Sequence, residues 1–430
     1  MVKAKHYKLK RSLSLFEATL YGVGIILGAG IYVLLGAGAG IAGNAIWISF
    51  IIAAIIAGFT GLSYAELSSR HPKNAAEYVY VQKAFKNRNL SFAVEWIMLF
   101  AIIISGATVA LGFAGYFSYL FGGSPIIIAS VLIVILSLIN YRGIKESSRF
   151  NIISTLIEIS GLLIVIIIGI FFIGKGNIDY FYSPQGTIGI LSATTLIFFA
   201  YIGFEGIVNI SEETKNAKNV MPKALILSLI ISTILYILVS ISAVSIVGWE
   251  TLANSKAPVT DVVSTAIQNS QLVISIIALF ATANTTLIIF IVCSRILYGL
   301  SNNHSLPKQL KKIGRTGTPY VAVFLVMVLG ILSLFIGGIE AIALLTNVGI
   351  FTVYIFVNLS LIMIRYTENK SGKKTKVLFK APLNIGWMPL TALLGLIITA
   401  LMMVYFQSEL IVYEIAIAIV GLLVYKLVNR

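Results

Sequence analysis

The sequence predicts an all-α integral membrane protein with twelve transmembrane helices. Of its 430 residues, 58% are hydrophobic and only 11% are charged, whereas a soluble chain carries about 25% charged residues. Apolar runs of membrane-spanning length, which is about 20 residues, recur along the whole chain. Basic residues are concentrated in every second connection between these runs. Together these observations exclude a soluble globular protein.

A spanning helix is expected wherever an apolar run reaches membrane length. The predicted helices cover residues 15–41, 44–67, 91–121, 125–141, 151–173, 188–210, 222–247, 271–299, 319–337, 340–364, 384–405 and 409–427. The polar connections between them are too short to fold as a separate domain, so residues 1–430 are expected to form one transmembrane domain. In residues 68–90, aromatic and charged residues alternate, which predicts a short amphipathic helix at the membrane surface.

The distribution of positive charge predicts the orientation in the membrane. The net charge is +15, and of the 31 lysines and arginines only Lys175 and Lys256 fall on one side of the predicted helices, which leaves 29 on the other. Because Lys and Arg accumulate on the cytoplasmic side, both termini are expected to be cytoplasmic in a multi-pass protein of the cell membrane. The positive charge reflects the orientation of the helices in the membrane, so nucleic-acid binding is not expected.

The sequence offers no residues for a metal, cofactor or catalytic centre. Cys293 lies in an apolar run and is expected to be a buried structural thiol, while His6, His71 and His304 lie far apart in polar segments. No hydrolase motif, P-loop or nucleotide-binding domain is present. Neither an enzyme nor a primary pump is therefore expected.

Seven glycines lie in the first predicted helix, within "GVGIILGAGIYVLLGAGAG" (residues 22–40). Each costs about 1 kcal/mol relative to alanine in a helix interior. Glycines can serve close helix packing, or they can mark a broken helix beside a cavity. The cluster at Gly28–Ile31 favours a break. A second break is expected at Gly203 and Gly206 in "FFAYIGFEG".

Paired breaks at corresponding positions of two five-helix halves indicate a transporter binding site at the bilayer midplane. The expected halves are residues 1–175 and 186–366, and residues 384–430 contain the last two predicted helices. Amides freed at a break can bind an anion, and freed carbonyls can bind a cation. A zwitterion such as an amino acid satisfies both.

Three segments resemble the amino acid–polyamine–organocation superfamily of transporters. They are "GVGIILGAGIYVLLG" (22–36), "GLSYAELSSRHPKNAAEYVYVQKAF" (61–85) and "FFAYIGFEGIVNISEETKNAKNVMPKA" (198–224). The likeness runs in order through at least the first eight helices. It implies a LeuT-type core of two inverted repeats, with discontinuous helices 1 and 6 and with helices 11 and 12 outside the core. Paired glycines of the superfamily are Ala75 and Ala76 here.

The resemblance also implies which groups bind the substrate. The backbone amides for its carboxylate belong to Gly28, Ala29 and Gly30. The carbonyls for its ammonium group lie near Ile25, Ile26, Phe199 and Ala200, and Phe199 also covers the substrate. The small or apolar residues expected to line the site are Ser105, Gly106, Thr108, Phe199, Ile202 and Gly203. No carboxylate pair for a cationic side chain is evident, so neutral L-amino acids are the expected substrates and polyamines the alternative.

Carboxylates inside spanning helices are functional by default, because burying them unpaired costs several kcal/mol. Glu205 lies beside the expected break of helix 6, and Glu158 stands where many members of the superfamily carry a lysine. Glu158 lies on one helical stripe with Asn151, Ser154 and Thr155, which must face protein or water.

Polar residues nearer the ends of helices have simpler interpretations. Glu17 and Glu66 are expected to meet basic residues, and Glu95 and Glu414 are interpreted as structural. In helix 10, the polar residues expected to serve bundle packing are Asn347, Tyr354 and Asn358. In helix 8, the residues that serve either helix packing or ion and substrate contact are Thr282, Asn284, Thr285 and Thr286.

Energy coupling is expected to use protons, with Glu158 or Glu205 as carrier, because a protonatable carboxylate needs no ordered ligand shell. The alternatives are sodium binding by Glu158 with Thr285 and Thr286, a structural role for Glu158, and amino acid exchange. A sensor or channel of the same fold is the remaining rival to a carrier.

Overall fold

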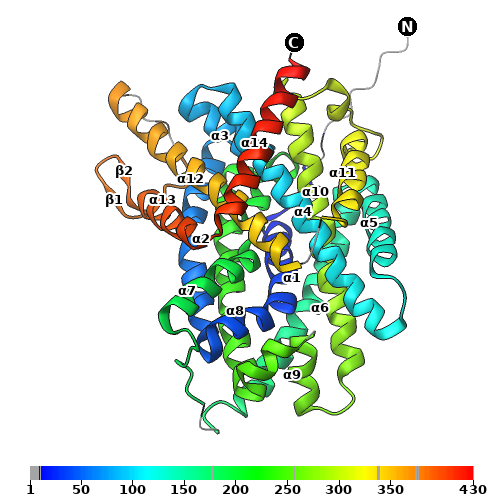
Figure 1. The fold of residues 1–430 in the computed structure, drawn as a ribbon. Helices are drawn as coiled ribbons and strands as arrows, with labels where there is room; N and C mark the ends of the chain where they lie inside the picture. Colours follow the sequence, from blue (N-terminus) through cyan, green and yellow to red (C-terminus); the bar gives the residue numbers. More distant parts are fainter. Residues whose placement is uncertain are drawn as a thin grey trace.

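The computed structural model describes residue 9 and residues 11–175, 178–255, 257–336, 339–372, 375 and 377–429. They form an elongated bundle of long helices (Figure 1). Within this part of the chain, ten helices are long and apolar enough to cross a membrane, and two shorter apolar helices cover Tyr320–Ser333 and Leu390–Tyr405. The prediction of an all-α membrane protein is confirmed, while the count of twelve spans stays a prediction.

The helices follow the predicted spans closely. The first half of the chain contains α1 (Leu15–Ala42), the 3₁₀ helix η1 (Gly43–Ala45), α2 (Ile46–Arg70), α3 (Ala76–Phe85), α4 (Arg88–Phe121), α5 (Pro125–Arg142) and α6 (Ile144–Ile170). The next part contains α7 (Gly186–Ile197), η2 (Phe198–Tyr201), η3 (Phe204–Glu213), α8 (Ala217–Asn254), α9 (Pro258–Ala266), α10 (Gln271–Asn302), η4 (Lys308–Lys311), α11 (Tyr320–Ser333) and α12 (Ile339–Ser371). The last part contains β1 (Asn384–Ile385), β2 (Met388–Pro389), α13 (Leu390–Met402), η5 (Met403–Tyr405) and α14 (Ser408–Val428).

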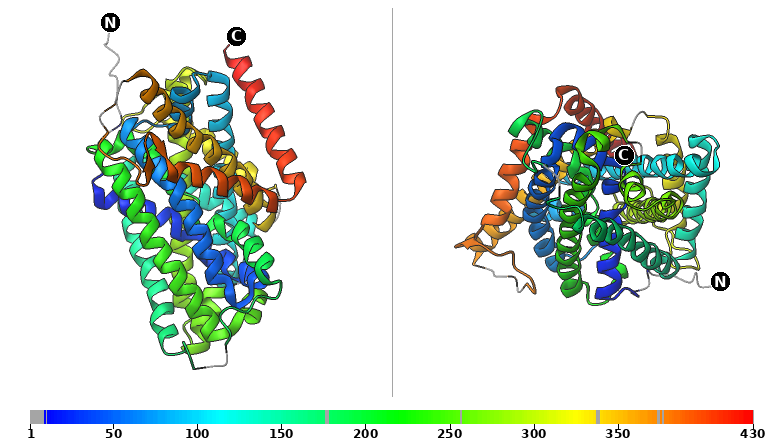
Figure 2. Two further views of the ribbon diagram at one scale, coloured as in Figure 1. Left: turned by 90° about the vertical axis from the view of Figure 1, so that its left-hand side faces the viewer. Right: turned by 90° about the horizontal axis from the view of Figure 1, so that it is seen from below.

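The two ends of the bundle differ in charge. α3 and the end of α14 lie at one end, and α9 lies at the other (Figure 1). The first of these ends carries the basic connections predicted for one side of the membrane, among them residues 308–315. We call it the basic end. Short α3 fills the connection where an amphipathic helix was predicted, and α14 stands at the edge of the bundle (Figure 2).

The first helix lies inside the bundle and is continuous. α1 begins with a capping box formed by Ser14 and Glu17, and it packs against α6, α7, α8 and α10. The predicted break at Gly28–Gly30 is wrong, because the helix runs without interruption from Leu15 to Ala42. Glu17 serves this cap, and its predicted contact with a basic residue stays a prediction, because most of the N-terminal basic residues lie outside the described part of the chain.

Close packing explains the glycines of α1. A Cβ atom at Gly28 would overlap the hydroxyl oxygen of Thr285, and one at Gly30 would overlap the Cα atom of Ala200. A Cβ atom at Gly22 would overlap the hydroxyl of Ser228. The absence of side chains therefore lets α1 approach its neighbours closely, as small residues do in membrane bundles.

The predicted break of the sixth helix is confirmed. α7 ends at Ile197, η2 follows, and the chain then leaves helical geometry at Ile202 (φ −59°, ψ 135°). Gly203 has φ 122° and ψ −22°, a conformation that glycine adopts without a steric penalty. The 3₁₀ helix η3 continues from Phe204, so helix 6 is divided into two arms.

The C-terminal part is attached to the outside of this core. β1 and β2 form a small antiparallel hairpin that pairs Asn384 with Pro389 and Ile385 with Met388. α13 packs against α2 and α12, and α14 packs against α4 and α12. α14 stands apart at the edge of the bundle (Figure 2), and the predicted division into two repeats and two outer helices stays a prediction.

Candidate functional site

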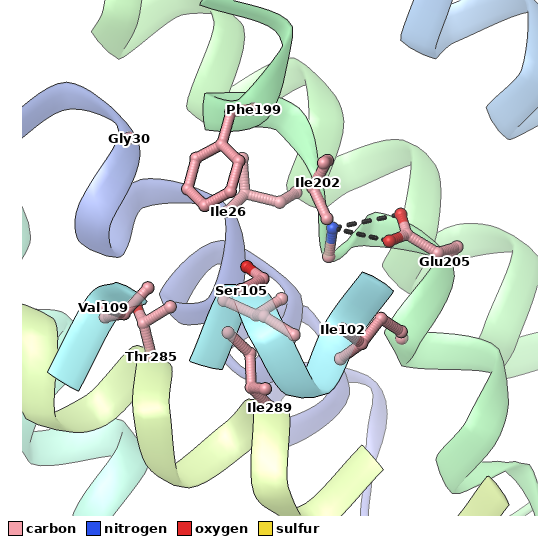
Figure 3. A pocket seen from close by; sticks show the side chains of 13 residues that line it. Ile26, Gly30, Ile102, Ser105, Val109, Phe199, Ile202, Glu205, Thr285 and Ile289 are labelled. Carbon is pink, nitrogen blue, oxygen red and sulfur yellow. Dashed lines mark hydrogen bonds between the residues drawn. The ribbon is translucent and has the colours of Figure 1, made fainter. Parts of the chain in front are cut away.

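A cavity lies between α1, α4, α10 and the break of the sixth helix. Its open volume in this structure is about 20 Å³, well below the about 300–1,000 Å³ typical of small-molecule sites, so the side chains around it must move apart before a substrate can enter. The predicted site residues that line it are Ile25, Ile26, Gly30, Ser105, Phe199, Ile202, Gly203, Glu205 and Thr285. The lining residues that sequence reasoning missed are Ile102, Val109, Gly206 and Ile289. Figure 3 shows Phe199 and Ile202 across the cavity from Ser105 and Ile289.

The lining is mostly aliphatic, with few polar groups. Ser105 and Thr285 contribute hydroxyls, and Glu205 contributes the one carboxylate among the lining residues. The Thr285 hydroxyl donates to the carbonyl of Gly24 at 3.0 Å. Such a lining accepts an apolar group and fixes its orientation through a small number of polar contacts.

Glu205 is held in place by the break of the sixth helix. The backbone N–H of Gly203 donates to both of its carboxylate oxygens at 3.0 Å, and the hydroxyl of Tyr354 donates to Oε2 at 2.9 Å (Figure 3). Tyr354 belongs to α12 and was interpreted as a packing residue. Its hydroxyl thus adds a cross-helix contact to the only carboxylate of the lining.

Tyr236 of α8 joins the two helices that form the cavity. Its hydroxyl lies within hydrogen-bonding distance of the carbonyl of Ile26 and, at 2.9 Å, of the carbonyl of Ala200. These are two of the carbonyls predicted to bind an ammonium group. A phenol has one proton to donate, so only one of the two carbonyls can receive it at a time. No sequence feature singles out Tyr236, because it lies in an ordinary apolar helix.

Several predicted site residues pack next to the cavity without lining it. Gly106 lies against Ile289 and Phe290, where a Cβ atom would come within 2.7 Å of both side chains. The hydroxyls of Thr108 and Thr286 donate to carbonyls of their own helices, at 3.1 and 2.9 Å. The residues outside the lining are Gly28, Gly106, Thr108, Glu158, Ala200 and Thr286. The side chain of Ala29 lies outside the described residues.

The polar stripe of α6 faces the protein interior. Asn151, Thr155 and Asn284 of α10 form a closed set of hydrogen bonds of 3.0–3.2 Å. Glu158 is completely buried, and within the part of the chain that the structure describes neither of its carboxylate oxygens has a hydrogen-bond partner. Its backbone carbonyl accepts from Tyr32 of α1 at 3.3 Å. An unpaired buried charge is very costly, so this environment favours the neutral carboxyl.

Sequence comparison identifies the family to which this chain belongs. The family model "Amino acid permease" matches residues 13–424. The chain belongs to the amino acid permease family. This permease is 29% identical to the branched-chain amino acid permease BcaP of Bacillus subtilis, over 93% of this chain and 94% of that protein. It is 30% identical to the methylthioribose transporter of the same organism, over 88% and 86% of the two chains.

A plant relative is matched over a smaller share of its own length. The cationic amino acid transporter 3 of Arabidopsis thaliana is 28% identical, over 84% of this chain and 63% of that protein. Family and relatives establish that the permease is an amino acid transporter and not an enzyme. Its multi-pass helical structure agrees with that function.

One departure from the superfamily pattern places an alanine in an unfavourable backbone conformation. Ala75, which by resemblance matches one of the superfamily's paired glycines, has φ 52°, in the left-handed region. A residue with a Cβ atom pays about 1–2 kcal/mol for this conformation. Gly299 of α10 packs directly on the same turn, where a Cβ atom would lie 2.6 Å from that of Ala75. This turn positions α3 at the basic end.

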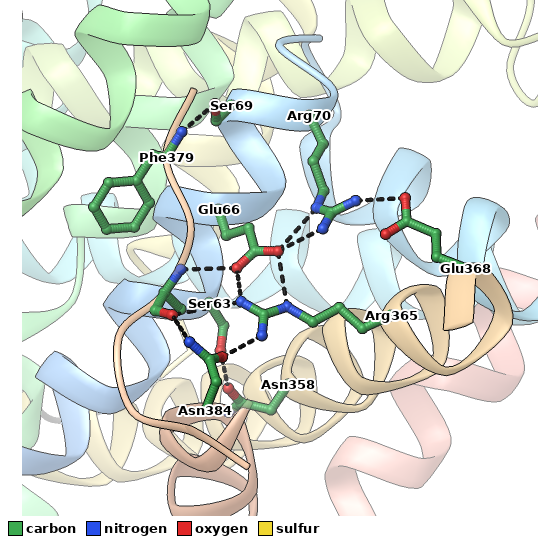
Figure 4. A network of polar contacts seen from close by, with 10 residues as sticks. Ser63, Glu66, Ser69, Arg70, Asn358, Arg365, Glu368, Phe379 and Asn384 are labelled. Atoms are coloured by element: carbon green, nitrogen blue, oxygen red, sulfur yellow. Dashed lines mark hydrogen bonds and ion pairs between the residues drawn. The ribbon is translucent and has the colours of Figure 1, made fainter. Parts of the chain in front are cut away.

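A buried ion network fastens α2 to α12 at the basic end. Glu66 is bound by Arg70 and by Arg365, and it also accepts the N–H of Ala381 at 2.8 Å (Figure 4). Arg70 makes a second contact, to Glu368 at 2.7 Å. The predicted contact of Glu66 with basic residues is confirmed. The network also holds the segment before β1 in place.

A second buried pair fastens η3 to α10. Arg295 and Glu213 are fully buried and make two hydrogen bonds, at 2.9 and 3.0 Å. Asn140 of α5 accepts from the same guanidinium at 3.0 Å. The main chain of Glu213 in turn accepts from Ser12, just before α1. Thus η3, the arm of helix 6 that leads away from the cavity, is attached to α10, to α5 and to the segment before α1.

Replacing Glu66 with alanine is expected to destabilise the permease by about 3–5 kcal/mol, because two buried arginines lose their shared carboxylate. The control is Glu368→Ala, because the Glu368 side chain is 22% exposed and, among the residues that the structure describes, pairs with Arg70 alone. Its expected cost is about 1 kcal/mol or less. Thermal unfolding of the two variants in detergent measures the difference. Equal destabilisation would contradict the central position of Glu66.

Proposed function

We propose that this permease carries neutral, aliphatic L-amino acids across the cell membrane by alternating access, driven by the proton gradient. The observation that supports this most is the lining of the cavity. Isoleucine, valine and phenylalanine side chains surround a single carboxylate and two hydroxyls. An aliphatic side chain fills the apolar part, and the charged ends of the amino acid meet the polar groups.

The α-ammonium group is assigned to Glu205. Its carboxylate lies at the break of the sixth helix and keeps its position through Gly203 and Tyr354. The carbonyls at Ile26 and Ala200, which share the single proton of Tyr236, offer further acceptors. A polyamine or a cationic amino acid brings a second positive charge, and the lining holds no second carboxylate for it.

The substrate carboxylate is assigned to Ser105. In the part of the chain that the structure describes, its hydroxyl lines the cavity and donates no hydrogen bond to protein. The amides of Gly28, Ala29 and Gly30 lie within the continuous α1. Their predicted role in binding the carboxylate therefore requires α1 to open when substrate enters, and Ser105 supplies a donor that needs no such change.

The substrate class is tested by a ligand panel on the purified protein. Leucine, isoleucine and valine are expected to raise the unfolding temperature, because a ligand that binds the folded state stabilises it by RT ln(1 + [L]/Kd). Leucine without its carboxylate or without its amine is expected to have little effect. Arginine and putrescine test the cationic alternatives. Methylthioribose, the substrate named for one relative, tests a sugar-like one.

A shift from putrescine or methylthioribose as large as that from leucine would overturn the proposal. So would an equal response to leucine and to its decarboxylated analogue, because the site would then not recognise a zwitterion. The panel needs no assumption about the coupling ion.

The proton carrier is assigned to Glu158. Its carboxyl is buried without a partner among the described groups, which favours the protonated form in this structure. It lies on α6 next to Tyr32 of α1, so movement of α1 would change its surroundings. Sodium coupling and obligate exchange are the alternatives. The basic end is assigned to the cytoplasm, as the positive-inside rule requires, and residues 1–175 and 186–366 are the halves that move.

A further inference from the structure

A pair of buried carboxyl groups lies at the basic end, away from the cavity. Glu77 of α3 and Glu95 of α4 are both fully buried, and the backbone N–H of Tyr78, the residue after Glu77, contacts Glu95, so the two carboxyl groups are neighbours. Glu95 accepts the N–H of Tyr78 at 2.6 Å, and Glu77 accepts from Asn209 at 3.3 Å. In each carboxyl group, Oε1 has no partner among the described residues. Sequence reasoning interpreted Glu95 as a structural residue and gave Glu77 no role.

The surroundings of the pair contain no compensating positive charge. In the part of the chain that the structure describes, no lysine, arginine or histidine forms an ion pair with either glutamate. Two carboxylates this close cannot both be ionised at low cost. Burial raises the pKa of Glu77 above its ordinary value. One proton held by the pair would leave it with a single negative charge.

Tyrosine hydroxyls add independent support for a bound proton. Tyr64 of α2 and Tyr80 of α3 are fully buried, and their hydroxyls lack hydrogen-bond partners within the described residues. The Tyr64 hydroxyl is directed at Glu77, and Tyr80 lies near both glutamates. Each hydroxyl can donate to a carboxylate or accept from a carboxylic acid. They are therefore suited to a pair that gains and loses a proton.

The pair is attached to the substrate cavity through η3. Asn209 of η3 donates to Glu77 and accepts the N–H of Ala76 at 3.1 Å. Glu205 lies on the same short helix, four residues earlier, and lines the cavity. The Tyr64 ring packs edge to face on those of Phe204 and Tyr354, so aromatic contacts link the two carboxyl sites.

We propose that Glu77 and Glu95 form a second proton-binding site, which holds one proton and whose occupancy is linked to the substrate cavity through Asn209 and η3. The groups that face the site are Tyr64 of α2, Tyr78 and Tyr80 of α3, Asn209 and Glu205 of η3, and Tyr354 of α12. Loss of the proton leaves two negative charges between α3 and α4. The contact of α3 with η3 then changes, and η3 transmits the change to the cavity. The link to substrate rests on the function proposed above, whereas the proton site does not.

The proton site is tested without substrate, by infrared titration of the carboxylic acid band in purified protein. The double variant Glu77→Gln/Glu95→Gln is expected to lack a band that the wild type shows, which assigns it to the pair. In either single variant, the remaining carboxyl is expected to lose its proton at a lower pH than the pair does, because the like charge is gone. Glu146→Gln is the control, since Glu146 is an exposed carboxylate at the basic end.

A second variant keeps the test decisive if a glutamine variant fails to fold. Asn209→Ala removes a donor to Glu77 and retains both carboxyls, so the band is expected to persist to a higher pH. The proposal is overturned if the double variant loses no band, or if all three pair variants titrate like the wild type.

The link to the cavity is tested by the pH dependence of leucine binding. Exchange of one linked proton changes the Kd by at most about tenfold per pH unit, and the single glutamine variants are expected to show a smaller slope than the wild type. If the infrared test succeeds and the slope is unchanged, the linkage is wrong. If leucine does not bind at all, the function proposed above fails while the proton site stands.

Discussion

Gly30→Ala is expected to abolish leucine binding, with at least a roughly 100-fold loss of affinity. The new Cβ atom would overlap the Cα atom of Ala200. Because this neighbour is backbone, no side-chain rotation can relieve the clash, and α1 must move away from the break of the sixth helix. Gly30 and Phe199 both line the cavity, so this movement changes the walls of the binding site.

The matched control on the same helix is Gly40→Ala. There the nearest atom to the new Cβ is the Cβ of Ala253 at 3.3 Å, so a shift of a few tenths of an ångström accommodates it. Binding is measured by the leucine-induced rise of the unfolding temperature, and folding by size-exclusion chromatography. Wild-type affinity in Gly30→Ala would contradict the packing of α1 against Ala200. Equal losses in both variants would indicate a general packing defect.

Glu158→Gln is expected to eliminate proton-driven accumulation of leucine and to leave exchange across the membrane intact. Glutamine has the shape of the neutral carboxyl and cannot release a proton, so the carrier can cycle without coupling. The buried carboxyl of Glu158 has no partner among the described groups that the amide would lose. Uptake into proteoliposomes with an inward proton gradient measures the drive.

Glu205→Gln is the informative comparison for this prediction. Glu205 lines the cavity and is assigned to the ammonium group, so its loss is expected to weaken leucine binding itself. Accumulation driven by sodium alone would exclude proton coupling. Unchanged proton-driven uptake in Glu158→Gln would show that Glu158 is not the carrier.

Much of the helical framework could be predicted because it depends on local composition. Apolar length and the placement of lysine and arginine located the spanning helices, and each predicted span overlaps a helix in the structure, although residues 384–389 of the eleventh span form a β-hairpin instead. The break of the sixth helix was also predictable. Gly203 needs a positive φ, and a carboxylate two residues later has no place in an ordinary membrane helix.

The break predicted in helix 1 shows where local information fails. A glycine that ends a helix and a glycine that admits a neighbour look the same in the sequence. At Gly28 and Gly30 the decision depends on Thr285 and Ala200, which are remote in the chain and adjacent in space. The same limit applies to Tyr236, whose importance comes entirely from the carbonyls of Ile26 and Ala200.

The sequence shows where charged residues lie in the helices, but not which of them contact one another. Glu66 was expected to meet basic residues near it, and Arg70 lies one turn away, but Arg365 comes from a distant helix. Glu95 was interpreted as a structural residue near the end of a span. The structure covers it with α3, because the turn at Ala75 directs Glu77 toward it.

We propose that the cavity between α1 and the broken sixth helix carries an aliphatic amino acid across the membrane. Counterflow tests it most directly: proteoliposomes preloaded with unlabelled leucine are diluted into labelled leucine without any ion gradient. We expect transient accumulation of label in wild type and in Glu158→Gln, and none in Gly30→Ala. Label that enters no faster with preloading than without it would contradict a carrier mechanism.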